Sequence, residues 1–437
     1  MLVLSAVATM VLAVTAAGAW KAGWLSRLRP PSGDSGGPAP ALPATAYDAY
    51  RSGQVLLERY DREGYIDRSI VLFRHAIDLR PDYPAALAGL GIAYWRKYRD
   101  LRDPMTLGFA GTHARRAVAL DPQLTVGLVA LAYVSVERGQ LDIAEKTLED
   151  ALAKDPRSAD ALAARAYLRL QQRNVPAALV DVRQAGEIRS ADWNLPLMEG
   201  VLLMTAGKRP DAVAPLERAA KLAPDSPLVL RNLGAAYYAV QRLDQATDSF
   251  QRALAIKPDP AVYSNLGTLF FYRGLYDQAV VAFEQGVKLR PNDFRTWGNL
   301  ADAYRLIPGR KDKASDAYAR ALQLLDQQRQ GAPDNLDLAT RRVSMLAKRQ
   351  DCGDALTASN ALAIERGTAT EQYRVAVTRE VCGQRDQDLA LLKKAIDVGY
   401  PVEQVNQDPE LEHLRSDLRF HYFLANRPAP AGGTPKR

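Results

Sequence analysis

The 437-residue chain has little of the chemistry on which most enzyme active sites depend. Its four histidines are dispersed, and none forms the H-x-x-x-H pair that binds a metal ion from one helix face. No G-x-x-x-x-G-K-[ST] loop is present to hold a phosphate, and no G-x-G-x-x-G segment to hold a dinucleotide. We therefore expect a protein that is not an enzyme, with no catalytic residues, no metal site and no cofactor.

The chain also lacks a strong excess of charge. It has 57 Lys and Arg against 50 Asp and Glu, for a net charge of +7, and no block of basic residues. This pattern is typical of a solvated helical surface and argues against a nucleic-acid partner. An apolar content of 47% is ample for a hydrophobic core.

What the sequence does contain is a regular period. A proline that ends an apolar segment recurs at steps of 34 residues, with a last step of 33. The positions are Pro122, Pro156, Ser190 in the equivalent place, Pro224, Pro258 and Pro291. A small residue precedes each position by 12 residues and another by 5, as Ala144 and Ala151 precede Pro156. A period of this length indicates a stacked-repeat architecture.

Each repeat is predicted to be two helices joined by a short turn. Within residues 142–152, apolar and small side chains recur at steps of three and four, which is helical spacing. Gly or polar pairs such as Gly139-Gln140 separate two such segments, and the proline ends the second helix. The small residues are expected where two helices cross. The 41-residue step from Pro81 to Pro122 predicts a longer turn around Tyr98–Gly111.

The pattern W/L-x-x-L-G/A-x-x-Y/F…A…F/L…A…P at 34 residues resembles the tetratricopeptide repeat. The resemblance implies an all-α, right-handed superhelical solenoid of helix-turn-helix repeats. We expect this solenoid to follow an N-terminal membrane helix, which the apolar first residues of the chain indicate. We expect about eight repeats over residues 46–326 and degenerate repeats over 327–400. The fold implies a protein or peptide partner held in the concave groove; the oligomeric state is left open.

The first residues predict a membrane segment. Residues 2–19 carry no charge, and Trp20 and Trp24 follow them. A run of about 18–20 apolar residues is the lower limit for crossing a bilayer. We expect a transmembrane helix or signal anchor over residues 1–24 and a Pro/Gly-rich linker over 25–45. A cleaved signal peptide stays open, because Ala17-Gly18-Ala19 has the small-x-small form of a cleavage site.

A second resemblance concerns location. Residues 47–95 and the closing segment 399–420 resemble bacterial membrane-anchored signalling proteins that join such repeats to a kinase, cyclase or winged-helix domain. Leu418 stands where their D-P-x-L-x-x-L-R-x-D-P-R-F pattern has its second proline, and the output domain is lacking here. The resemblance implies a single-pass bacterial inner-membrane protein with periplasmic repeats. Lys21 and Arg27, which follow the apolar run, favour the cytoplasmic side instead, and secretion after signal cleavage is the third alternative.

A peptide-binding groove is predicted on the first helices of the repeats. The sixth residue of this helix is asparagine in three successive units, and its amide can both donate and accept hydrogen bonds. The groove would comprise Asn232, Asn265, Asn299, Arg231, Tyr238, Phe271, Tyr272, Asp302 and Arg305. The asparagines could equally bond a neighbouring helix and serve the fold alone.

The C-terminal region carries two further expectations. Cys352 and Cys382 each precede a glycine at a turn, so they could stack and form a disulfide, or remain two free buried thiols. Residues 401–426 predict a capping segment, with a helix that begins at Asp408-Pro409 and places Leu411, Leu414 and Leu418 on one face. Arg415 and Asp417 would lie on its wetter side, and residues 427–437 would be a disordered tail.

The function that follows is a non-enzymatic scaffold that is tethered to a membrane and binds a protein or peptide in its groove. Two alternatives stay open. One is the ligand-sensing module of a signalling system whose kinase or transcription regulator is a separate chain. The other is a factor that assembles an envelope or secretion complex.

Overall fold

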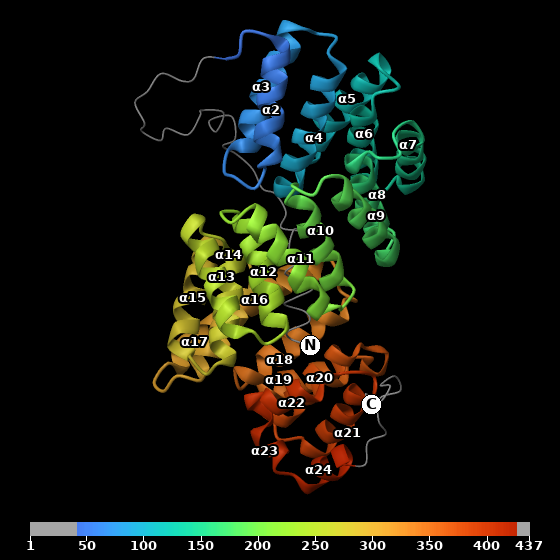
Figure 1. Ribbon diagram of the computed structural model, residues 1–437. Helices are drawn as coiled ribbons and strands as arrows, with labels where there is room; N and C mark the ends of the chain where they lie inside the picture. The colour runs from blue at the N-terminus through green and yellow to red at the C-terminus, as the bar shows by residue number, and fades with distance from the viewer. Residues whose placement is uncertain (1–41, 426–437) are drawn as a thin grey trace. The chain divides into compact units, whose positions relative to one another are not determined.

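The computed structural model describes residues 42–425 and is helical throughout that range, without strands (Figure 1). Its tertiary contacts fall into two compact units that divide between Ile256 and Lys257. We call residues 42–256 the N-terminal unit and residues 257–425 the C-terminal unit, and describe each by itself.

The N-terminal unit is built of antiparallel helix pairs, in which each helix packs on the next along the chain. Its helices are α2 (Ala46–Glu58), α3 (Tyr65–Leu79), α4 (Pro84–Leu101), α5 (Pro104–Leu120), α6 (Thr125–Glu137), α7 (Leu141–Lys154), α8 (Ala159–Gln171), α9 (Val175–Ile188), α10 (Asn194–Thr205), α11 (Arg209–Leu222), α12 (Pro227–Ala239) and α13 (Leu243–Ile256).

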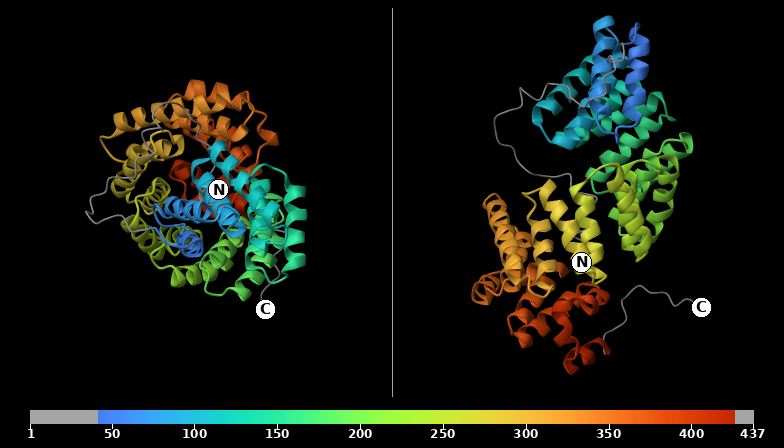
Figure 2. Two further views of the ribbon diagram at one scale, coloured as in Figure 1. Left: turned by 90° about the horizontal axis from the view of Figure 1, so that it is seen from above. Right: turned by 90° about the vertical axis from the view of Figure 1, so that its left-hand side faces the viewer.

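The C-terminal unit continues the same pattern and ends in short helices. Its elements are α14 (Pro260–Tyr272), α15 (Tyr276–Leu289), α16 (Phe294–Arg305), α17 (Lys311–Gln330), α18 (Leu336–Lys348), α19 (Cys352–Asn360), η2 (Ile364–Arg366), α20 (Ala369–Val381), α21 (Arg385–Asp397), α22 (Val402–Gln407), η3 (Pro409–Leu411), α23 (Glu412–Arg415) and α24 (Leu418–Ala425). Within each unit, consecutive pairs lie side by side (Figure 2). The predicted all-α stack of helix pairs is thus confirmed.

The small residues lie where the helices of a pair cross, as the period predicts. Gly234 of α12 faces the ring of Phe250 on α13, and a Cβ atom on this glycine would lie 2.7 Å from two ring carbons. Gly267 of α14 faces Phe283 of α15 in the same way, also at 2.7 Å. Both phenylalanines are buried. Glycine lets the two backbones approach until the aromatic ring fills the space between them.

The long step before Pro122 does not form the longer turn that the sequence predicts. The extra residues extend both helices instead: α4 has 18 residues and α5 has 17, where α6 and α7 have 13 and 14. Arg102 ends α4 with φ of 55°, and Asp103 caps α5 by accepting the N–H groups of Met105 and Thr106. Because Arg102 and Asp103 alone connect α4 to α5, the additional residues lengthen the two helices and not the turn.

The end of the chain departs from the predicted single capping helix. Asp408 does cap a helical turn, by accepting the N–H of Glu410 at 2.9 Å. The chain then forms η3 and α23, which follow each other directly, and breaks at Ser416 and Asp417 before α24. Leu411 and Leu414 are fully buried in one cluster with residues of α20 and α21, but Leu418 is 82% exposed. The predicted placement of Leu418 on the buried face is therefore wrong.

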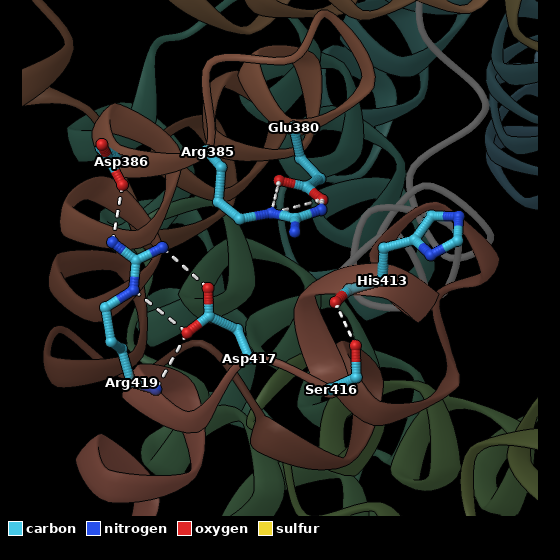
Figure 3. A network of polar contacts seen from close by, with 7 residues as sticks. All are labelled: Glu380, Arg385, Asp386, His413, Ser416, Asp417 and Arg419. Atoms are coloured by element: carbon cyan, nitrogen blue, oxygen red, sulfur yellow. Dashed lines mark hydrogen bonds and ion pairs between the residues drawn. The ribbon is translucent and has the colours of Figure 1, made fainter.

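A polar network holds the break in place (Figure 3). Asp417 accepts the backbone N–H of Arg419 at 2.9 Å and is ion-paired with its guanidinium at 2.7 Å. Arg419 also reaches Asp386 at the start of α21, at 2.6 Å. The hydrogen bonds from Arg419 lower the pKa of Asp417 to about 2. Asp417 lies beneath Arg419 and not on the wetter side that the sequence predicts, because it caps the last helix.

The prediction of a single-pass inner-membrane protein with periplasmic repeats requires correction. Among residues 42–425, no helix combines the length and apolar character needed to cross a bilayer. The apolar segment 1–24 and most of the linker 25–45 lie outside the described residues, as does the tail 427–437. The membrane partner that the sequence predicts thus has no support in the structure.

Cys352 at the start of α19 and Cys382 at the end of α20 are joined by a disulfide, with their Cα atoms 5.4 Å apart. Of the two alternatives that the sequence leaves open, this structure contains the bonded pair. The bond ties the last two helix pairs of the C-terminal unit together.

Candidate functional site

A small cavity of about 60 Å³ lies between α16, α17, α18 and α20 of the C-terminal unit. We call it the basic pocket, because four of its lining side chains are cationic. The lining comprises Arg295, Gly298, Asn299, Asp302, Tyr318, Arg341, Ser344, Met345, Lys348 and Arg374.

Helical spacing brings these side chains together. On α16, Arg295, Asn299 and Asp302 follow each other at steps of four and three, and so they share one face. Asp293 fixes the start of this helix by accepting the N–H of Arg295 at 3.1 Å. On α18, Arg341 and Lys348 are two turns apart on the face toward α16 and α20.

One carboxylate neutralises part of the basic charge from outside the lining. Asp337, one turn before Arg341, pairs with Arg341 at 2.9 Å and with Arg374 at 2.6 Å. Burial acts to raise the pKa of Asp337, but these two guanidinium groups outweigh it and lower the pKa to about 2. Asp337 is therefore ionised at any physiological pH and is shared between two cations.

Asp302 neutralises Lys348. Its two oxygens lie 3.0 and 2.9 Å from the Lys348 Nζ, and it also accepts a hydrogen bond from the Tyr318 hydroxyl. Burial acts to lower the pKa of Lys348, but Asp302 and Glu410 outweigh this effect and raise it. Lys348 therefore stays charged and committed to Asp302.

Arg295 has no such partner. It forms no ion pair with any residue between 42 and 425, and its buried Nε has no hydrogen-bond acceptor. Burial and the positive charge of Arg341 lower the pKa of Arg295, and the same two causes lower that of Arg374 to about 10. Burial is the larger cause of both pKa shifts and the charge of Arg341 the second, while Asp337 opposes both. An anion in the pocket would counter the part that comes from the like charge.

The structure places three of the predicted groove residues in or beside this pocket. Asn299 and Asp302 line it, and Arg305, one turn further along α16, is ion-paired with Glu410. Burial opposes the charge on Arg305, but Glu410 outweighs it and raises its pKa. Arg305 is therefore engaged within the protein.

The other predicted groove residues do not come to the basic pocket. Asn232 donates to the Leu228 carbonyl of its own helix at 2.7 Å, and Asn265 is only 8% exposed. Phe271 and Tyr272 pack edge to face, with ring centroids 5.6 Å apart. Arg231 and Tyr238 belong to the N-terminal unit, where Tyr238 is buried and its pKa is raised by that burial.

Sequence reasoning missed Arg295, Arg341, Lys348 and Arg374. Three of them lie in the region where the repeat landmarks fade, so no register was available to align them with the groove positions of α16. The signal that was present is the pair Arg341 and Lys348, at the seven-residue spacing of one helix face.

Comparison with known families accounts for the middle of the chain. Residues 129–191, 197–260 and 264–335 match the model of the tetratricopeptide repeat. The helix pairs over these residues are similar to tetratricopeptide repeats, and the matched stretches cover less than half of the chain. The matched stretches span both units and include α16, which supplies one wall of the basic pocket.

Several solved structures are similar to this chain. The hetero-tetramer Cut9–Hcn1 of APC/C is 20% identical, with a TM-score of 0.50 over 63% of this chain and 52% of that one. Human IFIT1, solved as a dimer with m7Gppp-AAAA, is 20% identical with a TM-score of 0.48, over 64% of this chain and 71% of its own. PilF of Pseudomonas aeruginosa is 21% identical, with a TM-score of 0.41 over 49% of this chain and 94% of its own. No curated protein matches the chain. At this identity the likeness to Cut9–Hcn1 shows the fold alone, and the resemblance to signalling proteins stays a prediction.

Proposed function

We propose that this protein is a non-enzymatic scaffold, and that the basic pocket binds an acidic group of a protein partner. The tetratricopeptide repeats support a role in protein interaction. The observation that carries the proposal is Arg295, a partly buried guanidinium that has no carboxylate partner in residues 42–425 and lies beside Arg341 in a cavity. Arg341 is itself paired with Asp337, so Arg295 is the guanidinium that an acidic group of a partner would pair with.

A carboxylate fits the pocket in charge and size. A guanidinium presents two parallel N–H groups to a carboxylate, which gives a charge-assisted and directional pair of hydrogen bonds. The cavity of about 60 Å³ has the volume of about two water molecules, at about 30 Å³ for each. A space of this size can admit a carboxylate group, and the acidic group of a peptide is the occupant that we propose.

Asn299 gives the predicted amide a place in this proposal. It lies on the pocket wall between Arg295 and Asp302, where its side-chain amide can donate to and accept from the backbone of a bound peptide. The acidic side chain would then enter the cavity while the peptide backbone runs along α16. Asn232 bonds its own helix and Asn265 is buried, so we assign neither of them a part in binding.

The test is the affinity of the full chain for a fluorescein-labelled hexaglutamate peptide, measured by fluorescence anisotropy at low salt. Arg295→Gln should weaken binding about tenfold or more, since a hydrogen bond to a charged group is worth about 1.5–3 kcal/mol. The matched control is Arg252→Gln, which removes one exposed arginine from α13 and should leave the affinity within twofold.

A hexalysine peptide should not bind, and binding of hexaglutamate should weaken as salt is added, because salt screens the attraction. The proposal fails if Arg295→Gln and Arg252→Gln have the same effect. General attraction by the net positive charge of the chain would then explain the binding.

A further inference from the structure

The turn between α2 and α3 makes contacts far along the chain. Residues 59–64 belong to the first helix pair, yet they are bonded to the start of α10 and to the turn before α12 in the same unit. The tyrosine contact spans 134 residues and the arginine contact 166. Helix pairs in a stack of this kind touch only their neighbours, so packing between adjacent pairs does not account for these contacts.

Tyr60 occupies the centre of this contact. Its ring lies under the guanidinium of Arg96 on α4, at 3.8 Å from the ring centroid, and 5.2 Å from the ring of Trp193. Its hydroxyl donates to the side-chain carbonyl of Asn194 at 2.6 Å. The Trp193 indole N–H in turn donates to the backbone carbonyl of Glu58 at 3.1 Å. Tyr60 thus contacts the Arg96 guanidinium with one ring face, the Asn194 amide with its hydroxyl and the Trp193 indole with its ring.

Two basic residues flank this tyrosine and share one acceptor. Arg59 lies 2.9 Å from Asp225, and Arg62 is ion-paired with the same carboxylate. Asp225 remains 48% exposed and Arg59 30% exposed. Ion pairs this exposed contribute little, because water and salt screen them. The two ion pairs therefore add specificity to the position of the turn and contribute little to the free energy that keeps it there.

The surface beneath the turn is formed from first helices of the repeats and the turns that precede them. Arg96 lies on α4, Asn194 opens α10, and Asp225 precedes α12. The helices beside Arg96 add further aromatic surface: Trp95 stacks on Tyr133 of α6 at 3.8 Å between ring centroids. A backbone carbonyl acceptor, an aromatic side chain and basic flanks are the features by which a peptide ligand is held, and here they come from the protein itself.

We propose that residues 59–62, Arg-Tyr-Asp-Arg, are an internal ligand of a peptide site on the N-terminal unit. The partner segment that this site fits has an aromatic residue between two basic residues, and it binds by displacing the turn. The site differs from the basic pocket in unit and in chemistry, since it recognises an aromatic residue flanked by two arginines and not a lone carboxylate.

The test uses the full chain and a fluorescein-labelled peptide with the sequence of residues 57–64, LERYDREG. The double variant Arg59→Ala with Tyr60→Ala removes the internal ligand and leaves the site intact. Anisotropy should show the peptide binding this variant at least tenfold more tightly than the wild type, because in the wild type the attached turn competes at high effective concentration. The same peptide with alanine for tyrosine should not bind.

Two further variants locate the binding. Asp225→Asn, added to the double variant, should weaken the peptide severalfold. The matched control is Tyr47→Ala with Arg51→Ala, which removes the same two residue types from the exposed face of α2 and should bind as the wild type does.

Each other outcome overturns the proposal. Equal binding to the wild type and the double variant, or binding to neither, means that no site was uncovered. A double variant that loses helical circular dichroism means that the turn is a structural tie and not a ligand. Because Arg295→Gln should leave this peptide unaffected, failure here is distinguishable from failure of the basic pocket.

Discussion

A methyl group added to Gly234 should disrupt the crossing of α12 and α13. The new Cβ in Gly234→Ala would lie 2.7 Å from two carbons of the Phe250 ring, closer than real Cβ atoms approach. Phe250 is fully buried, so its ring is packed against its neighbours in the core. Overpacking a core costs about 1–3 kcal/mol, and the gain from replacing a helical glycine is about 0.5–1 kcal/mol. We therefore expect a net loss of up to about 2.5 kcal/mol.

The matched control is Gly186→Ala in α9, where no atom lies within 4 Å of the new Cβ. Only the lower conformational entropy of alanine in the unfolded chain acts there, so the free energy of unfolding of this variant should rise by about 0.5–1 kcal/mol. Urea unfolding followed by circular dichroism measures both changes, and amide exchange in α12 and α13 shows whether the loss is local. Phe250→Leu should lessen the effect of Gly234→Ala, because the two changes are coupled through one contact. If Gly234→Ala is as stable as Gly186→Ala, the close packing of glycine against the ring does not set the helix crossing.

Three further predictions concern the C-terminal unit. Burial, together with the Glu380 carboxyl, raises the pKa of Asp388 to about 8, well above its value in the unfolded chain. The free energy of unfolding should therefore fall as the pH rises from about 4 to 8. Asp388→Asn should remove this fall, measured as urea midpoints across that pH range. Phe420→Ala should cost about 3–5 kcal/mol, seen as faster amide exchange in α20 and α21, since this ring is buried in the terminal cluster. Reduction of the Cys352–Cys382 bond, which closes a 30-residue separation, should lower stability by about 3–4 kcal/mol, measured by unfolding with and without dithiothreitol.

The fold could be read from the sequence wherever a repeat restates the same local rule. Gly234 and Gly267 occupy the same place in consecutive repeats, and each packs against the phenylalanine sixteen residues later in the chain. One pairing rule therefore predicts both crossings. The insertion before Pro122 had no such second copy, and helical periodicity alone did not distinguish longer helices from a longer turn.

The end of the chain and the site were harder for a physical reason. Leu418 follows Leu411 and Leu414 at helical spacing, but Asp417 starts a new helix and so rotates Leu418 out to solvent. The basic pocket combines side chains from four helices, two of which lie in degenerate repeats. Asn299 could be predicted because it repeats at a fixed register. Arg374 could not, since its role depends on a tertiary contact with Asp337 of a preceding helix pair.

Hydrogen–deuterium exchange of the full chain, with and without hexaglutamate, tests most directly whether the basic pocket is the place where an acidic segment binds. Our account predicts added protection in α16, α18 and α20, with α7 and α9 of the N-terminal unit unchanged. Arg295→Gln should abolish that protection at the same peptide concentration. Protection spread over both units, or confined to helices outside the pocket, would contradict it.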